Sequence, residues 1–437
     1  MAKKYQHRVS AIFEAPSGIE TALQAWADTF DVALYLDHND YPVSHPALHT
    51  WDVLVAAGVR RCVTEVSGQA FVALEQLRSE CEGDWLFGYC SYDLKNELED
   101  LNSAHFDGLK WPDLFFFQPE YVAGVRGGRL YMYSHSTPPA TLLQTILQMP
   151  APSPQAAPSI ALHPRMSPPE YLKKVETIRQ HIAGGDIYEM NFCQEFFAEH
   201  VQINPLHTFQ RLNKRAAAPF SAYLKKNIHY LLCASPERYL RKQGSRLVTQ
   251  PIKGTRPRSA DTVEDAAIRS ELATCEKDRS ENVMIVDLVR NDLARDCLPG
   301  TIQVDELFGI YSFPTVHQMI STVSGQLPPG DSGMGALRSC FPMGSMTGAP
   351  KVMSMQLIEQ YETTRRGLFS GAVGYFDPEG NYDFNVVIRS IQYRADTGYL
   401  SCMVGGAIVY DSVPEQEYEE CLTKIKAIRD VLGYSES

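Results

Sequence analysis

Apolar residues recur at helical spacing in one segment near the middle of the chain. These positions are Leu172, Val175, Ile178 and Ile182. Residues three or four apart share one face of a helix, so they form a stripe that can be buried. Ser167 and Glu170 match a capping box with Pro168 in the first helical position, and Gly184-Gly185 follows the stripe. The pattern predicts an amphipathic helix over 168–184.

Other segments divide into aromatic and β-branched runs, which favour strands, and longer periodic runs, which favour helices. The predicted strands cover 85–92, 114–125, 230–233, 246–252, 371–376, 385–393 and 399–404. The further predicted helices cover 19–30, 68–81, 261–275, 278–294, 350–361 and 414–433. Because several strands follow one another without a helix between them, we expect an antiparallel α+β architecture and not a doubly wound parallel sheet.

A proline-rich stretch interrupts this pattern. Nine prolines lie between Thr137 and Pro169, which indicates a connector with one short helix over 142–149. The chain is therefore predicted to consist of an N-terminal region (1–136), a connector (137–164) and a larger C-terminal region (165–437).

Composition narrows the class of protein. The 437 residues are 44% hydrophobic and 21% charged, with a net charge of −12 and a pI near 5.5. These values are ordinary for a globular protein, and the acidity argues against nucleic acid and anionic membranes as partners. The ten cysteines include no C-x-x-C pair, which argues against a zinc site and suits a reducing, cytoplasmic location. Neither a signal peptide nor a membrane-spanning run is apparent.

Two acidic pairs stand at helical spacing. Asp278 and Glu281 lie three residues apart, as do Glu417 and Glu420 near the C-terminus. Each pair shares one helix face, and two such faces together can hold a hard cation such as Mg²⁺. The alternative is a solvated surface, which spacing alone favours because acids are common near helix N-termini.

Lys253 ends an apolar run and precedes Gly254, which allows close approach of the backbone. The nearby charges of Arg256 and Arg258 would favour a neutral, nucleophilic amine. A surface lysine at a strand end is the simpler alternative and, from these residues alone, the better one. His317 is a candidate catalytic residue, although a lone histidine is more often structural.

A glycine-rich turn runs from Gly344 to Lys351. It fails the phosphate-loop pattern, because Pro350 and Val352 stand where glycine and Ser or Thr are required. It could still offer backbone N–H groups to an anion at the start of a helix, or be a plain turn. The chain has no H-E-x-x-H, no G-x-S-x-G and no G-x-C-x-G motif.

The order of several motifs along the chain is more specific than any one of them. They are Ser235-Pro236-Glu237-Arg238, Pro251-Ile252-Lys253-Gly254-Thr255, the run from Glu281 to Asp292, the turn from Gly344 to Lys351, Ile388-Arg389, and Glu417-Tyr418-Glu419-Glu420. This order closely resembles the chorismate-utilising enzymes, which include anthranilate, aminodeoxychorismate, isochorismate and salicylate synthases. The resemblance covers about 165–437, with a weaker echo at 87–95. It implies a large antiparallel β-sandwich flanked by helices.

The resemblance also implies a set of site residues. Glu281 and Glu420 would contact Mg²⁺, and Asp278 and Glu417 would act mainly through its waters. Arg389 and Tyr375 would hold the pyruvyl carboxylate of chorismate. The remaining substrate-binding positions would be Thr255, Thr347, Gly405, Gly406 and Lys424.

Lys253 indicates the branch of the family. Aminodeoxychorismate synthases typically have lysine at this position, where anthranilate and isochorismate synthases have alanine. The resemblance implies that Lys253 attacks ring C2, that Glu237 protonates the departing C4 hydroxyl, and that ammonia then enters at C4. The product, 4-amino-4-deoxychorismate, leads to p-aminobenzoate and folate. Asn191 also matches this branch, whereas Glu189 replaces the more usual glutamine.

Two alternatives remain open, and one partner is expected. An anthranilate synthase large subunit would eliminate pyruvate, although no Leu-Leu-Glu-Ser-like element of its feedback-inhibited members is present. A silent chorismate-binding regulator is the second alternative. Because no glutaminase motif occurs in the chain, ammonia is expected to come from glutamine through a separate glutamine amidotransferase subunit.

Overall fold

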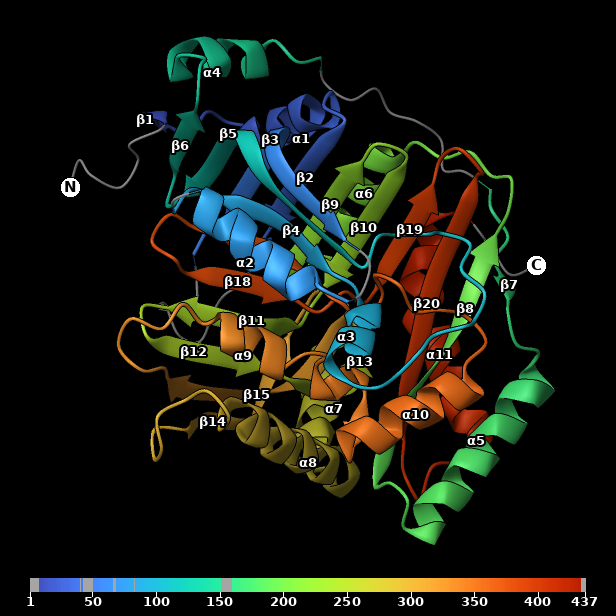
Figure 1. The fold of residues 1–437 in the computed structure, drawn as a ribbon. Coiled ribbons are helices and arrows are strands. Elements are labelled where there is room, and N and C mark those ends of the chain that lie inside the picture. The colour runs from blue at the N-terminus through green and yellow to red at the C-terminus, as the bar shows by residue number, and fades with distance from the viewer. Residues whose placement is uncertain are drawn as a thin grey trace.

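A computed structural model describes residues 8–39, 41, 50–65, 68–81, 83–150 and 159–433. Within these ranges 20 strands form one continuous sheet, and every pair of strands is antiparallel. The sheet folds over into two layers, with helices on the outside (Figure 1). The predicted α+β antiparallel sandwich is thus confirmed. None of the described helices is long and apolar enough to cross a membrane.

One layer begins with the N-terminal strands and continues into C-terminal ones. Its order is β1 (Val9–Glu14), β6 (Arg129–Ser134), β5 (Leu114–Arg126), β3 (Val53–Glu65), β2 (Val32–Asp37), β9 (Phe220–Lys226), β10 (His229–Ser235), β19 (Ser390–Arg394), β20 (Tyr399–Ile408) and β8 (Glu189–Ala198). Two short strands, β7 (His163–Pro164) and β16 (Gly348–Ala349), pair with β8.

The second layer branches from β5, which therefore joins the two. Its order is β4 (Leu86–Cys90), β17 (Ala372–Phe376), β18 (Tyr382–Asn385), β11 (Arg238–Gln243), β12 (Arg246–Gln250) and β15 (Val316–Gln326). The strands β13 (Ile252–Pro257) and β14 (Gln303–Ser312) both pair with β15.

The alternation of side chains on β4 and β5 shows how the layers are held together. On β5, Phe115 and Phe117 belong to the core between the layers, whereas Leu114 and Phe116 pack against helices outside. Successive residues of a strand face opposite sides of a sheet. Both faces are covered here, so these strands are apolar at nearly every position.

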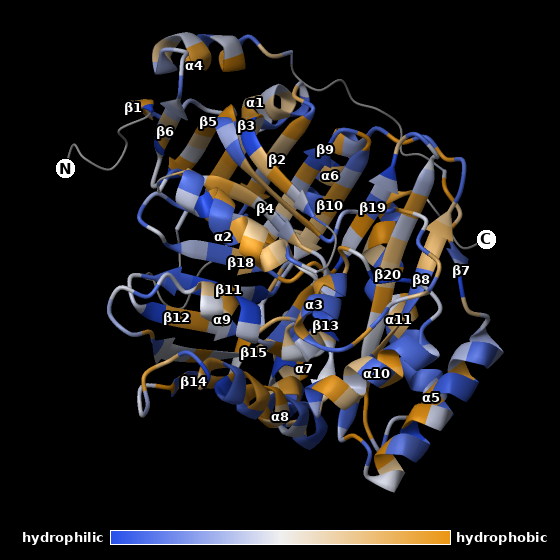
Figure 2. Ribbon diagram, in the orientation of Figure 1, coloured by the Kyte–Doolittle hydropathy of each residue, from blue (hydrophilic) through white to orange (hydrophobic). Residues whose placement is uncertain are grey.

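Helices cover both outer faces. Beside the first layer lie α1 (Ile19–Asp28), α4 (Pro139–Leu147), α5 (Pro168–Gly184), α6 (Pro205–Ala216) and α11 (Pro414–Val431). Beside the second lie α2 (Ala70–Glu80), α8 (Glu276–Leu293) and α9 (Met334–Ser339). The others are α3 (Lys95–Leu98), α7 (Thr262–Thr274) and α10 (Lys351–Tyr361). The outer helices are polar on one side and apolar on the other, as Figure 2 shows.

Three local predictions need correction. The strand predicted over 246–252 is two strands that meet at Pro251, and the strand predicted over 385–393 is broken by the turn that holds Arg389 at φ 52°. The helix α5 begins and ends as predicted, but the Ser167 side chain makes no capping hydrogen bond. The packing of its stripe is close to that predicted, with Val175 and Ile178 fully buried.

Strands pair across the predicted regional boundary. The N-terminal β2 pairs with β9, and β4 pairs with β17. The connector helix is present as α4, while residues 151–158 of the connector lie outside the described residues. The predicted ranges 1–136 and 165–437 are therefore successive parts of the sequence, but their strands pair with each other in one continuous sheet.

Candidate active site

A cavity of about 350 Å³ opens among the C-terminal elements. It lies where β8, β13, β20, α8 and α11 come together, at the junction of the two layers (Figure 1). The predicted site residues that line it are Asn191, Glu237, Lys253, Thr255, Asp278, Glu281, Arg389, Gly405, Glu420 and Lys424. Their side chains come from segments far apart in sequence, so the fold brings together most of the predicted set.

Lys253 is placed in this cavity by the irregular start of β13. The pairing of β13 with β15 shifts register between Ile252 and Thr255. Gly254, at φ 88°, follows in a conformation that suits glycine, and a Cβ there would lie 3.0 Å from Asp278. The Lys253 side chain is buried and contacts the carboxylate of Glu189 on β8. A lysine that points into a closed site is not the surface residue of the simpler alternative.

The charge of Lys253 is set by carboxylates. Burial lowers the pKa of Lys253, but the carboxylates of Glu189 and Glu281 raise it by more, so the net shift is upward. The expected influence of the two arginines is wrong, because Arg256 pairs with Asp278 at 2.8 Å and Arg258 pairs with Asp265 at 2.7 Å. Lys253 therefore rests as an ammonium and must lose a proton before it can act as a nucleophile.

Glu237 lies opposite, in the loop before β11. Its Oε1 accepts a hydrogen bond from the Ser345 hydroxyl at 2.6 Å, and its backbone carbonyl accepts one from the Val386 amide at 3.0 Å. Burial raises the pKa of Glu237 from 4.5 to about 7, against the opposing effects of Ser345 and Lys253. A carboxyl group with this pKa is partly protonated at neutral pH, so it can donate a proton.

Asn191 extends from the same strand as Glu189. Its side-chain amide donates to the Met346 carbonyl at 3.4 Å, and its backbone amide donates to the Thr347 carbonyl at 2.8 Å. These bonds tie β8 to the glycine-rich turn of 344–351. The turn thus forms a wall of the cavity instead of a phosphate loop.

The two acidic pairs approach each other from α8 and α11. Lys277 links the helices, since its Nζ lies 3.9 Å from Glu281 and 3.8 Å from Glu417. The Glu417 and Glu420 carboxylates converge on Gly406, where a Cβ would lie 3.2 Å from each. Of the four carboxylates, Asp278 and Glu417 are buried and Glu281 is nearly so. The alternative of a solvated surface is therefore excluded for these three.

Each carboxylate of this group has a cationic neighbour. Asp278 pairs with Arg256 at 2.8 Å and Glu420 pairs with Lys424 at 2.6 Å. Lys424 lowers the pKa of Glu420, whereas burial raises the pKa of Glu281 to about 7. No three acidic, histidine or cysteine side chains of the described residues are arranged to hold a metal ion together. The oxygen ligands suit Mg²⁺, and a lysine ammonium lies between two of them.

Arg389 offers the cavity a cation of a different kind. Its left-handed backbone, at φ 52°, lies in the turn between β18 and β19. Among the described residues its guanidinium has no hydrogen-bond or ion-pair partner, and burial lowers its pKa. A guanidinium in this position can bind a carboxylate with two parallel hydrogen bonds. Together with Lys424 it explains how an acidic protein can hold an anion.

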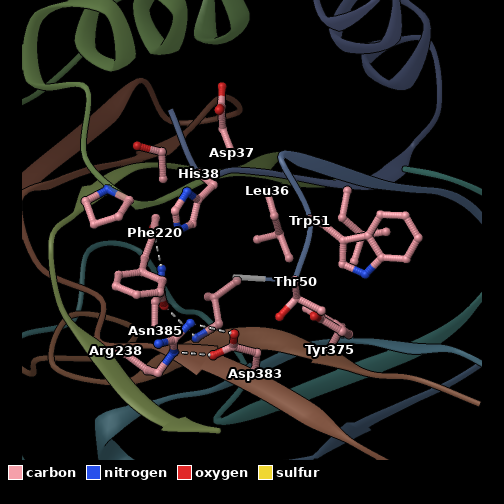
Figure 3. Close-up of a pocket in the computed structure, with 14 residues that line it drawn as sticks. Leu36, Asp37, His38, Thr50, Trp51, Phe220, Arg238, Tyr375, Asp383 and Asn385 are labelled. Atoms are coloured by element: carbon pink, nitrogen blue, oxygen red, sulfur yellow. Dashed lines mark hydrogen bonds and ion pairs between the residues drawn. The ribbon is translucent and has the colours of Figure 1, made fainter. Parts of the chain in front are cut away.

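Tyr375 does not line this cavity. On β17 it shares a face with Val373, and both line a second cavity of about 60 Å³ with Trp51 (Figure 3). The buried Arg238 guanidinium lies in this cavity and pairs with Asp383 at 2.9 Å. Alternation along β17 turns Tyr375 and Val373 toward the core between the layers.

His317 and Thr347 are also displaced from the cavity wall. His317 is fully buried and bridges Asp265, at 2.9 Å, and Ser312, at 2.8 Å. The Thr347 hydroxyl donates to the Met343 carbonyl at 3.2 Å within its own turn. Gly406 and Glu417 lie just behind the wall, beside Gly405 and Glu420.

Several lining residues were not predicted from the sequence, among them Gln318, Ser345, Phe369 and Lys277. Gln318 follows His317 on β15 and faces the opposite side. Period-two alternation along a correctly placed strand would have identified it, since Val316 and Gln318 line the cavity and His317 does not. In the sequence, Glu189 is distinguished only by standing where the family more usually has glutamine.

Comparison with known proteins agrees with this geometry. Residues 40–430 match the model of the family described as chorismate binding enzyme. Aminodeoxychorismate synthase component 1 of Klebsiella aerogenes is 36% identical over 343 residues, which are 78% of this chain and 75% of that protein. Its counterpart in Escherichia coli is 40% identical over 263 residues, 60% of this chain and only 57% of that protein.

Other relatives carry different names. Anthranilate synthase component 1 of Thermus thermophilus is 34% identical over 361 residues, 80% of this chain and 78% of that protein. The crystal structure of anthranilate synthase component I from Streptococcus pneumoniae has a TM-score of 0.76 at 24% identity, and the match covers 89% of this chain and 94% of that one. This likeness establishes the fold.

Proposed function

Since the chain belongs to the chorismate binding enzyme family, we propose that it is the synthase subunit that converts chorismate and ammonia to 4-amino-4-deoxychorismate. The observation that carries this proposal is the Lys253 amine, buried in the cavity together with the Glu237 carboxyl and the Arg389 guanidinium. A nucleophile, an acid and an anion-binding cation are the three groups that the reaction needs.

Substrate binding rests on charge. Chorismate carries two carboxylates, and two cations line the cavity, Arg389 in the turn before β19 and Lys424 on α11. The Arg389 guanidinium has no partner among the described residues, so it is available for the pyruvyl carboxylate. Thr255 and the backbone at Gly405 complete the lining. We expect the ring to lie between Lys253 and Glu237.

The reaction then divides between two side chains. The Lys253 amine attacks ring C2, the two ring double bonds shift, and the C4–O bond breaks as Glu237 protonates the departing hydroxyl to give water. Ammonia adds at C4, the double bonds shift back, and the C2–N bond to Lys253 breaks. The enolpyruvyl group is kept throughout. A Glu237 pKa of about 7 leaves enough acid at neutral pH for this step.

We propose Mg²⁺ as the cofactor, at the acidic pairs of α8 and α11. Glu281 and Glu420 would hold it directly, with Asp278 and Glu417 acting through its waters. When bound, the metal would neutralise this acidic wall and bind the ring carboxylate. The support is the chemistry of the ligands and the position of Lys277, whose ammonium lies between Glu281 and Glu417.

We also propose that the ammonia comes from a separate glutamine amidotransferase subunit. Relatives are named component 1, which implies a second component in those proteins. Most ammonia is protonated at neutral pH and cannot attack carbon, so a partner that releases it beside the cavity would raise the rate.

Product identity tests the proposal. Purified protein is incubated with chorismate, Mg²⁺ and an ammonium salt, and the products are identified by mass spectrometry. We expect 4-amino-4-deoxychorismate, which keeps the enolpyruvyl group. Anthranilate and pyruvate would instead show an anthranilate synthase, which the relatives in that branch make the second candidate. Bound but unconverted chorismate would show a silent regulator.

A further inference from the structure

Glu189 is a buried carboxylate in contact with Lys253, and the proposed reaction gives it no task. It begins β8, its side chain is fully buried, and its Oε1 contacts the Nζ of Lys253. Its other oxygen, Oε2, is buried and has no hydrogen-bond partner among the described residues. An unpaired carboxylate oxygen inside a protein is costly. This oxygen is therefore available to bind a proton.

We propose that Glu189 is the base that takes the proton from Lys253, keeps it while the lysine is bonded to the substrate, and then returns it. This inference rests on the proposed function, because it concerns the covalent step. Because the Glu189 carboxylate already contacts the Lys253 ammonium, the proton can be transferred without movement of the backbone. Glutamine, the more usual residue at this position in the family, cannot accept the proton.

The protons balance over one cycle. Glu189 takes a proton from the Lys253 ammonium, and the neutral amine forms the C2–N bond while Glu237 gives its proton to the leaving hydroxyl. The lysine nitrogen is now a secondary ammonium. Ammonia adds at C4, and the C2–N bond breaks to release neutral Lys253, to which Glu189 returns the stored proton. The new C4 ammonium gives a proton to Glu237. The net reaction consumes chorismate and ammonia and releases water.

The other acids near Lys253 are less suited to this task. Glu281 on α8 and Glu420 on α11 face the lysine but lie beside Lys277 and Lys424 respectively. Glu237 must hold its own proton for the hydroxyl, and its Oε1 is bonded to Ser345. Among the carboxylates that face Lys253, Glu189 alone both contacts its Nζ and keeps a second oxygen without a partner in the described residues.

The test follows the covalent adduct. Parental protein, Glu189→Gln and Glu189→Asp are mixed with chorismate and Mg²⁺ without ammonia from pH 6 to 9. The rate at which the protein gains the mass of chorismate less water is measured by intact-protein mass spectrometry. Glu195→Gln is the matched control, because Glu195 is a buried carboxylate on the same strand whose partners are Arg165, Thr364 and Tyr399.

We expect Glu189→Gln to form the adduct about 100-fold more slowly than the parental protein at pH 7. The rate of Glu189→Gln divided by the parental rate should rise with pH, because hydroxide then deprotonates Lys253 in the variant. Ionisation of Glu237 changes both rates alike and so cancels in this ratio. Glu189→Asp should recover part of the rate and the parental pH profile. Glu195→Gln should lower only the melting temperature.

Four results would overturn the inference. The first is parental adduct formation by Glu189→Gln with an unchanged pH profile. The second is a folded Glu189→Gln protein that is slower by one constant factor at every pH, which would indicate positioning alone. The third is a parental protein that forms no adduct in this test and no aminated product when an ammonium salt is added, which would overturn the proposed function itself. The fourth is aminated product without an adduct, which would overturn this inference and the covalent route but leave the proposed function standing.

Discussion

Lys253 shows most directly how one residue can decide the chemistry of this site. Replacing it by alanine removes the proposed nucleophile but leaves Glu237 and Arg389 in place. We expect Lys253→Ala to lose 4-amino-4-deoxychorismate formation by at least about 100-fold, measured by product mass at saturating ammonium. Any slow product should be of the anthranilate type, from direct addition at C2. Formation of the parental product at the parental rate would contradict the covalent role.

Glu237 couples activity to stability. Its pKa is raised from 4.5 to about 7 in the folded protein, so folding favours the protonated form. Stability is therefore lost as pH rises from about 4.5 to about 7 and stays low above that range. Glu237→Gln removes the ionisation, and we expect its free energy of unfolding relative to the parental protein to rise by about 1–3 kcal/mol from pH 5 to pH 8.

The same variant should lose activity. An amide cannot protonate the departing hydroxyl, so we expect kcat to fall by about 100-fold or more. Denaturant titrations at both pH values give the stability difference, and product mass gives the rate. A variant that is active, or whose stability difference does not change with pH, would remove Glu237 from the role of acid.

Site residues that stand in a short sequence motif could be predicted from the sequence. Residues whose orientation depends on the register of a strand could not. Lys253, Glu237 and Arg389 were found because each stands in a short motif of characteristic order. Tyr375 and His317 do not line the cavity. For His317 the reason is alternation along β15, since its neighbours Val316 and Gln318 line the cavity and His317 faces the opposite side. Choosing the correct face requires the pairing register, which the sequence of one chain does not supply.

At the scale of elements, α8 and α11 act together. Each contributes an acidic pair, and Lys277 lies between Glu281 and Glu417. We expect Glu281→Gln and Glu420→Gln each to raise the Mg²⁺ concentration that gives half-maximal activity by about 10-fold or more, because an amide oxygen is a poorer ligand for a hard cation. Mg²⁺ titrations of initial rate measure this.

The same two helices provide the controls. Glu276→Gln on α8 and Glu419→Gln on α11 remove an exposed carboxylate that does not line the cavity. Their Mg²⁺ dependence should match that of the parental protein. If Glu281→Gln and Glu420→Gln behave like these controls, the acidic pairs do not hold the metal.

Elements differed in how readily the sequence revealed them. The helices α5, α8, α10 and α11 were predicted within a few residues, because a buried stripe and terminal signals mark them. The strand β15 was missed because its buried side chains are largely polar. These are His317, Gln318, Ser321, Thr322 and Ser324. A polar side chain can be buried only if it forms hydrogen bonds inside the protein. A strand rich in such residues shows no clear hydrophobic pattern in the sequence.

At the scale of the whole molecule, the proposed source of nitrogen can be tested. Alone, the chain should use ammonium salts, with a rate that rises with pH as the free amine fraction grows, until ionisation of Glu237 above about pH 7 opposes the rise. Glutamine should become a donor at neutral pH only when a glutaminase subunit is added. Initial rates with each donor, from pH 6 to 9, measure this.

Efficient use of glutamine by the isolated chain would contradict the prediction. A variant of the added partner that cannot hydrolyse glutamine serves as the control, since it should restore no glutamine use while ammonium use stays unchanged.

The architecture itself was predictable from strands that follow one another directly. The pairing of β2 with β9 and of β4 with β17 was not, because it joins segments that are remote in sequence.

This remote pairing bears on how the chain folds while it is being synthesised. Gly88 on β4 is paired with Gly374 on β17, so β4 emerges from the ribosome roughly 290 residues before its partner. At about 5–20 residues per second, that interval is roughly 15–60 s. During this interval one edge of β4 has no strand to pair with, and much apolar surface on β5 is not yet covered. Unpaired edges and exposed apolar surface promote aggregation. Newly made chains should therefore depend on chaperones until the last third of the protein has been translated.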